Sequence, residues 1–170
     1  AASAAAAPVV AAASAPEPAA SAPPAFEWPG ATRLSYKLTG HVRGEVHGDA
    51  QVEWLRQGSH YQVHVDVRVG LPIAPLFARR SSSSGELSAA GLVPQRYDEE
   101  TRQIFRERRR LALTFEPDVV VMPNGSRRER WPGTQDAASQ FVQLSWLFTT
   151  RPELLRGGGS LELPLALPRS

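Results

Sequence analysis

The sequence contains no cysteine, and only one of its 19 basic residues, Lys37, is a lysine. Without cysteine, the chain as given can form no disulfide, thiolate metal site, cysteine nucleophile or lipidated cysteine. No apolar run approaches the roughly 20 residues that a membrane-spanning helix needs. The net charge of +2 is small beside the clustered excess typical of nucleic-acid binders. The composition therefore indicates an ordinary globular domain.

The 170 residues suit one folded domain preceded by a tether. Residues 1–25 are alanine, proline and serine apart from two valines and one glutamate. Such a segment buries too little apolar surface to offset its ordering entropy. We therefore expect a disordered Ala/Pro/Ser-rich tether over residues 1–26 and a single β-rich domain over residues 27–170.

After the tether, apolar and polar residues alternate as they do in half-buried strands. The alternating apolar sets are Leu34, Tyr36 and Leu38, then Ala50, Val52 and Trp54, then Tyr61, Val63, Val65, Val67 and Val69. Hairpin turns are expected at Arg56–Ser59, Gly91, Arg108–Arg110 and Pro123–Ser126, the last containing a strong Asn-Gly signal. Consecutive hairpins predict an antiparallel meander.

One helix is expected late in the chain, from Asp136, which can cap it, to about Thr149. Its apolar residues occupy more than one side, which predicts deep burial against the sheet. Pro152 ends or kinks the helix, and three glycines separate it from a last strand over residues 161–167. The predicted fold class is α+β, mostly β: a curled antiparallel meander, half-barrel-like, packed around this helix.

Three segments resemble a known family: GELSAAGLVPQRYDEE (85–100), GTQDAASQFVQL (133–144) and GGGSLELPLALP (157–168). They are similar to bacterial exported proteins of the family "domain of unknown function 3108", with its Gly-Leu-x-Pro turn before an x-Tyr strand and its Gln-Asp-x-x-Ser helix start. The resemblance covers residues 33–168 and implies a periplasmic or cell-envelope protein, although no intact signal peptide is visible in the chain. It also implies a strongly curved sheet around a helix, here apparently lacking the C-terminal strands that related proteins add.

In outline, that fold is similar to the half-barrels of periplasmic lipoprotein carriers, which hold acyl chains. We therefore expect a non-enzymatic domain that binds a lipid, an acyl chain or a partner protein and needs no cofactor. The apolar segment 70–77, interrupted by two prolines, is expected as a loop that forms a contact surface or the lip of a cavity, or that plugs the open end of the sheet, which is the favoured interpretation. Nine residues are expected near a cavity, although core packing is the favoured role of each: Tyr36, Trp54, Tyr61, Val63, Val65, Ile73, Phe77, Phe141 and Trp146.

A metal-dependent hydrolase is the first alternative. Pairing Arg56 with Ser59 places Trp54 opposite Tyr61 and gathers His64, Asp66 and Asp49 on the polar face. Three converging ligands could hold a metal ion. The competing interpretation, a solvated face, is favoured because these residues lie on an open surface.

The remaining sequence patterns are weaker evidence for a function. Arg106–Arg110 and Arg127–Arg130 suggest a nucleic-acid or anionic-surface binder, although solvated turns are the favoured interpretation. The four serines at 81–84 lack the Gly-x-Ser-x-Gly setting of a nucleophile elbow. The acidic run 98–100 is expected in a hairpin turn, where such residues are ordinary.

Overall fold

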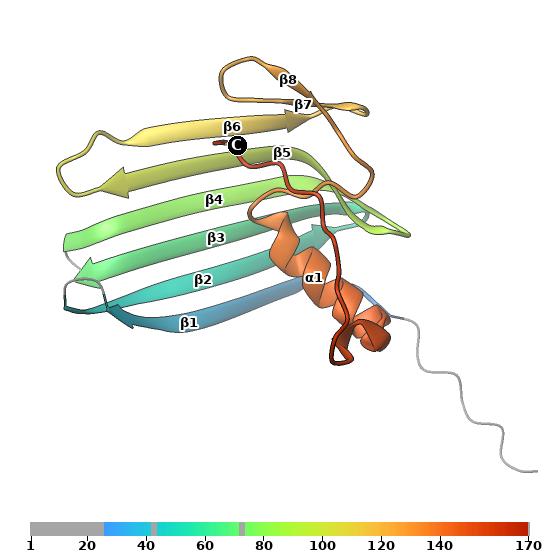
Figure 1. Ribbon diagram of the computed structural model, residues 1–170, viewed down its shortest axis with the longest axis horizontal. Helices are drawn as coiled ribbons and strands as arrows, with labels where there is room; N and C mark the ends of the chain where they lie inside the picture. Colours follow the sequence, from blue (N-terminus) through green and yellow to red (C-terminus); the bar gives the residue numbers. More distant parts are fainter. Residues whose placement is uncertain (1–25, 42–43, 72–73, 170) are drawn as a thin grey trace, which may run out of the picture.

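The computed structural model describes residues 26–41, 44–71 and 74–169. Within them, eight strands follow one another in a single antiparallel sheet that does not close, and one α-helix and a short 3-10 helix follow the strands (Figure 1). The elements are β1 Ala31–His41, β2 Glu45–Gln57, β3 His60–Leu71, β4 Ala74–Ser88, β5 Gly91–Gln103, β6 Arg109–Phe115, β7 Val119–Val121, β8 Arg127–Glu129, α1 Ser139–Thr150 and η1 Pro152–Leu155. The mostly β meander with one helix is confirmed.

The β2–β3 register differs from the expected one by two residues. Trp54 lies opposite Val63, and Arg56 rather than Trp54 lies opposite Tyr61. The reason is the turn: Gly58 has a φ of 61° and takes the first central position, with Ser59 second. A glycine there is typical of a type II′ hairpin turn. Because the shift is even, each side chain stays on the expected face.

The expected loop at residues 70–77 is mostly strand. Leu71 pairs with Ala74 and Gly70 with Pro75, after an irregularity between Val69 and Gly70. The φ of 110° at Gly70 absorbs this irregularity, which also accommodates a proline that cannot donate to the ladder. Ile73 lies outside the described residues.

The β5–β6 turn lies at residues 104–108 and not at Arg108–Arg110. Arg110 pairs with Glu100 in the ladder, and its guanidinium Nε lies 3.0 Å from that carboxylate. The acidic run 98–100 is therefore in the middle of β5, and the turn expected there was wrong. Alternating charges that pair across strands look in sequence like a solvated turn, which explains the error.

The prediction of a last strand over residues 161–167 was also wrong. This segment is extended but forms only an isolated parallel bridge between Leu165 and Gln135 in the described part of the chain. The backbone N–H of Gln135 donates to Pro164 O, and that of Ala166 donates to Gln135 O. Pro164 and Pro168 lack N–H groups, so a longer ladder would be interrupted at both.

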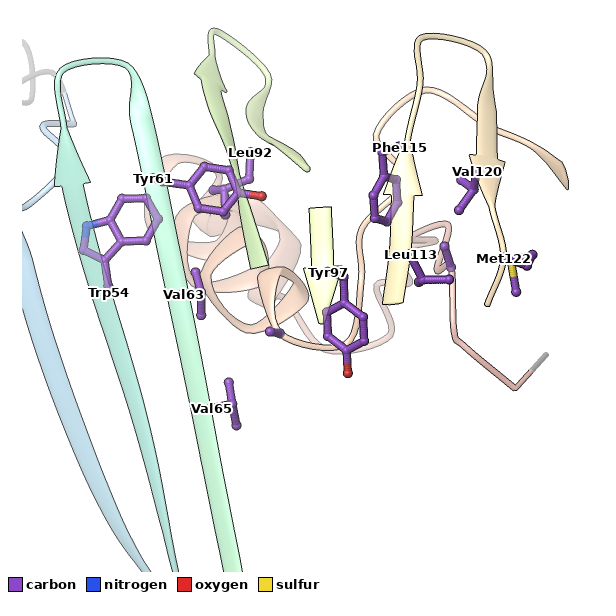
Figure 2. Packing of buried hydrophobic residues seen from close by; sticks show 12 residues of the cluster. Trp54, Tyr61, Val63, Val65, Leu92, Tyr97, Leu113, Phe115, Val120 and Met122 are labelled. Carbon is purple, nitrogen blue, oxygen red and sulfur yellow. The ribbon is translucent and has the colours of Figure 1, made fainter. Parts of the chain in front are cut away.

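The two faces of the sheet differ in chemistry. One face, called here the apolar face, carries Trp54, Val63 and Leu113 in one cross-strand row and Val52 and Val65 in the next. Figure 2 shows part of this core, with Trp54, Tyr61, Val63 and Val65 on one side and Tyr97, Leu113, Phe115, Val120 and Met122 on the other. The opposite face, called the charged face, carries paired acidic and basic residues.

Helix α1 lies against one end of the sheet, the helix end, as Figure 1 shows. The Gln143 amide fixes it there, because Oε1 accepts from Leu92 N at 2.8 Å and Nε2 donates to Ala90 O at 3.1 Å. Phe141 is half exposed, so the helix is not buried on all sides as expected. None of the helices in the described ranges is long and apolar enough to cross a membrane.

Candidate apolar ligand site

A stack of aromatic rings crosses the helix end. Trp54 stacks on Tyr61 with ring centroids 5.6 Å apart, and Trp28 stacks on Trp54 at 5.1 Å. On its other side, Trp28 stacks on Trp146 of α1 at 6.1 Å. Phe26 meets Trp28 edge-on at 5.0 Å. Stacked and edge-on pairs add stability beyond their buried area, so these rings form a firm wall.

The Phe26–Gly30 segment reaches this wall because the second strand holds it. The Trp54 indole N–H donates to Pro29 O at 2.7 Å, and the backbone N–H of Arg56 donates to Gly30 O at 2.8 Å. Since the one polar atom of the Trp54 ring is bonded to the backbone, the ring presents only apolar surface. The segment thereby carries Trp28 between the sheet and the helix.

A pocket of about 220 Å³ lies between this segment, β1–β2 and α1. Its walls are mostly apolar, with hydroxyls only from Thr32, Ser145 and Thr149. The apolar lining consists of Phe26, Trp28, Pro29, Leu34, Val52, Trp54, Val142 and Trp146. The volume is below the roughly 300–1,000 Å³ of ordinary small-molecule sites. The pocket therefore suits a slender apolar group.

The pocket continues into an exposed strip on the apolar face. Leu34 and Tyr36 are each about half exposed, although both point to the side of the sheet that carries the core. From Thr32 to Leu38 the strip extends six residues, or about 20 Å at the rise of a strand. One bilayer leaflet is about 15 Å thick in its hydrocarbon part, so an acyl chain matches this length.

A buried hydrogen-bond network anchors the helix beside the aromatic stack. Asp136 is fully buried; its Oδ1 accepts the backbone N–H groups of Ala138 and Ser139 at 2.8 Å each, and its Oδ2 accepts the Ser83 hydroxyl at 2.6 Å. Tyr61 joins through Ser83 at 3.2 Å. Burial raises the pKa of Asp136 above its usual value even though these hydrogen bonds lower it. The helix cap expected at Asp136 was wrong, because α1 begins at Ser139 with Ala138 as its N-cap residue and no side-chain cap hydrogen bond; Asp136 instead binds the backbone N–H groups at the helix start.

A second buried polar group is Glu99 of β5. Its carboxylate accepts the Tyr97 hydroxyl at 2.9 Å and the Thr101 hydroxyl at 3.1 Å, and Arg169 lies 3.2 Å away. Arg79 approaches to 3.7 Å. Burial raises the pKa of Tyr97, so this tyrosine stays protonated and donates. The group therefore ties the C-terminal segment to the sheet.

The proposed metal ligands do not converge. His64 lies opposite Glu53, Asp66 opposite Gln51 and Asp49 opposite Arg68. Both aspartates are neutralised by cations, Asp66 by Arg80 at 2.8 Å and Asp49 by Lys37 at 2.5 Å. Within the described ranges, no group of three or more histidine, cysteine, aspartate or glutamate side chains could hold a metal ion.

The charged face also has a hollow of about 550 Å³, larger than the apolar pocket. It lies among ion-paired side chains: Asp98 pairs with Arg96, and Glu100 with Arg102, Arg108 and Arg110. Desolvation alone would raise the pKa of Glu100, but hydrogen bonds from Arg110 and Arg102 lower it. The charged groups in its walls are already paired with one another, so its size does not make it the better site for an apolar ligand.

The structure does not bring the residues expected near a cavity together in one place. The structure puts Trp54 and Trp146 on the pocket wall, and Tyr61, Val63 and Val65 in the core behind it. Tyr36 lies on the strip. The other two described residues are elsewhere: Phe77 lies under the Arg79 guanidinium at 5.6 Å, and Phe141 is solvent-exposed.

Sequence reasoning missed Phe26 and Trp28, which form one side of the pocket. Composition assigned Phe26 to the tether, and Trp28 was not considered as a site residue. The available signal was the motif Phe-Glu-Trp-Pro-Gly, since two large aromatic residues directly after an Ala/Pro-rich segment are not typical of a disordered tether.

Comparison of the chain with protein-family models, with curated proteins and with solved structures found no match in any of the three. The resemblance to exported proteins of the family "domain of unknown function 3108" therefore stays a prediction. The function has to be argued from the site alone.

Proposed function

We propose that this protein is a non-enzymatic binding domain for an apolar ligand, with a single acyl chain as the ligand class. The observation that carries the proposal is the pocket lined by Trp28, Trp54 and Trp146, which opens onto the exposed strip of Leu34 and Tyr36. Large apolar side chains left exposed beside a preformed apolar pocket are typical of ligand sites.

The shape of the site supports a chain rather than a compact ligand. The pocket is too small for most drug-sized molecules, but the pocket and strip together offer a long and narrow apolar track. In this proposal the open sheet acts as a half-barrel curled toward α1, and the ligand occupies the part of the apolar face that the helix leaves free. A location in the periplasm or cell envelope belongs to the same proposal and rests on the family resemblance.

Binding can be tested by tryptophan quenching with a bromine-labelled fatty acid. Saturable quenching is expected, since three of the four tryptophans line the pocket. Ser145→Phe places a ring in the pocket and should abolish the quenching. The matched control is Thr150→Phe on the same helix, because each hydroxyl donates to the carbonyl four residues earlier at 2.8 Å, but only Ser145 lines the pocket.

Quenching that persists in Ser145→Phe at the level of the control would show that the fatty acid binds elsewhere. An absence of quenching in the parent protein, together with a ligand-free mass after gentle purification and native mass spectrometry, would exclude the proposed function.

A further inference from the structure

The end of the sheet away from α1, the open end, carries a second group of exposed apolar side chains. The β3–β4 and β5–β6 hairpins lie side by side there, and the backbone N–H of Ile104 donates to Leu76 O at 3.0 Å. Leu71 is 66% exposed, and Leu76 and Ile104 are about half exposed. With Phe105, these residues form what we call the apolar tip. It is separate from the pocket at the helix end.

Phe105 is the most exposed large apolar residue in the described chain, at 98%. Its φ of 60° lies in the left-handed region, which a bulky residue seldom adopts. A turn that only had to reverse the chain would be served better by glycine or asparagine. The β5–β6 turn thus holds an aromatic ring in solvent at a conformational cost, a combination that suggests a function for the ring.

The charge around the tip is positive. Residues 100–110 contain five arginines and two glutamates, an excess of three positive charges. Glu100 is shared by Arg102, Arg108 and Arg110. In the described ranges no carboxylate forms an ion pair with Arg106 or Arg109. Arg106 directly follows Phe105, Arg109 begins β6 three residues later, and both remain available to an external anion.

From this arrangement we propose that the open end of the sheet docks on an anionic lipid bilayer. Phe105, Ile104 and the two leucines enter the boundary between headgroups and acyl chains, and Arg106 and Arg109 contact lipid phosphates. Stable membrane attachment generally takes two signals, and an apolar insertion with a basic cluster supplies both. A nucleic acid would use the arginines and Phe105, but it would leave the three aliphatic side chains without an apolar partner.

Vesicle co-sedimentation tests the proposal in two steps. The protein should bind vesicles of phosphatidylcholine with about one third phosphatidylglycerol and should not bind phosphatidylcholine alone. Phe105→Ser should weaken binding at least tenfold. Arg106→Gln with Arg109→Gln should weaken it by about fivefold for each arginine. The controls Leu155→Ser and Arg128→Gln with Arg151→Gln remove exposed groups of the same kind elsewhere and should bind like the parent.

Insertion can be measured directly because the chain has no cysteine. A polarity-sensitive dye on Phe105→Cys should shift to the blue with anionic vesicles, and the same dye on Leu155→Cys should not shift. Equal binding by Phe105→Ser and the parent, or a dye response that is the same at both positions, overturns the proposal. So does binding to a DNA duplex without binding to the vesicles, which would identify a nucleic-acid surface.

Discussion

The buried carboxylate of Asp136 leads to a prediction with two variants, of which one should destabilise the fold and the other should leave its stability nearly unchanged. Asp136→Ala removes the acceptor for three donors: the backbone N–H groups of Ala138 and Ser139 and the hydroxyl of Ser83. Leaving a buried donor unsatisfied costs about 1–3 kcal/mol. Removing a desolvated charge offsets part of this cost. We expect the free energy of unfolding to fall by about 2–4 kcal/mol.

Asp136→Asn keeps the shape and both backbone hydrogen bonds, because the amide oxygen can accept the N–H groups of Ala138 and Ser139. Its NH₂ group then faces Ser83, whose hydroxyl can accept that hydrogen bond and donate to Tyr61 in turn. The free energy of unfolding at neutral pH should therefore change by less than about 1 kcal/mol. The contrast between alanine and asparagine separates the hydrogen bonds from the charge.

The effect of the Asp136 charge on stability can be measured from the pH dependence of the free energy of unfolding. The pKa of Asp136 is raised above its ordinary value of 3.8 chiefly by burial, so the folded protein binds this proton more tightly than the unfolded chain does. Lowering the pH through the raised pKa should stabilise the parent relative to Asp136→Asn. The gain is complete below the unfolded pKa of about 3.9 and is lost as the pH rises through the folded value.

Urea unfolding of the parent and both variants at a series of pH values measures these differences. Subtracting the asparagine variant from the parent cancels the other titrating groups, which are the same in both proteins. A difference that does not change with pH, or an alanine variant within 0.5 kcal/mol of the parent, would refute the reasoning about this network.

Four further substitutions have expected outcomes. Gly91→Ala should lower the free energy of unfolding by about 2–4 kcal/mol, because φ at this position is +102° and the added Cβ would lie 2.2 Å from the Gln143 side-chain oxygen. Gly125→Ala, where φ is +81° but the space around the Cβ is open, should lower it by only about 1–2 kcal/mol in the same urea titration. Phe105→Asn should raise the thermal midpoint slightly, because asparagine tolerates a left-handed φ; a lower midpoint would show that the ring contributes to folding. Glu99→Ala should cost about 2–3 kcal/mol in urea unfolding by leaving its buried hydroxyl donors unsatisfied, and a smaller loss than for an exposed glutamate would contradict its buried role.

The sequence predicted the features that depend on side-chain periodicity. Alternation in β1, β2 and β3 located the strands and their faces, and the Asn-Gly pair located the β7–β8 turn. It did not predict features that depend on partners far away in the chain. The acidic run in β5 has arginine partners in β5 itself and also far away in the chain, at Arg79, Arg110 and Arg169. The extent of β4 is explained only by its pairing with β3 and β5.

Only part of the candidate site was predicted from the sequence. Trp54 and Trp146 were expected near a cavity because they are large and apolar, and both line the pocket. The pocket also needs Trp28, which reaches it through a hydrogen bond from Trp54 to Pro29 across 25 residues of sequence. No local pattern shows such a contact. The metal hypothesis failed to gather its ligands for a related reason, since a two-residue shift of register moved Asp49 opposite a cation.

The exposed strip lies between the two proposed binding surfaces, and a substitution on it can distinguish the two proposals. It runs along β1 from the pocket at the helix end toward the open end, where the apolar tip lies. Tyr36 lies on this strip, is about half exposed and does not line the pocket. Tyr36→Asp places a charge on the track that a chain would follow, and charges are costly beside an apolar ligand. It should weaken fatty-acid binding at least tenfold, measured by tryptophan quenching, and leave vesicle docking unchanged. If Tyr36→Asp binds the fatty acid like the parent, the ligand does not extend along the strip and is confined to the pocket.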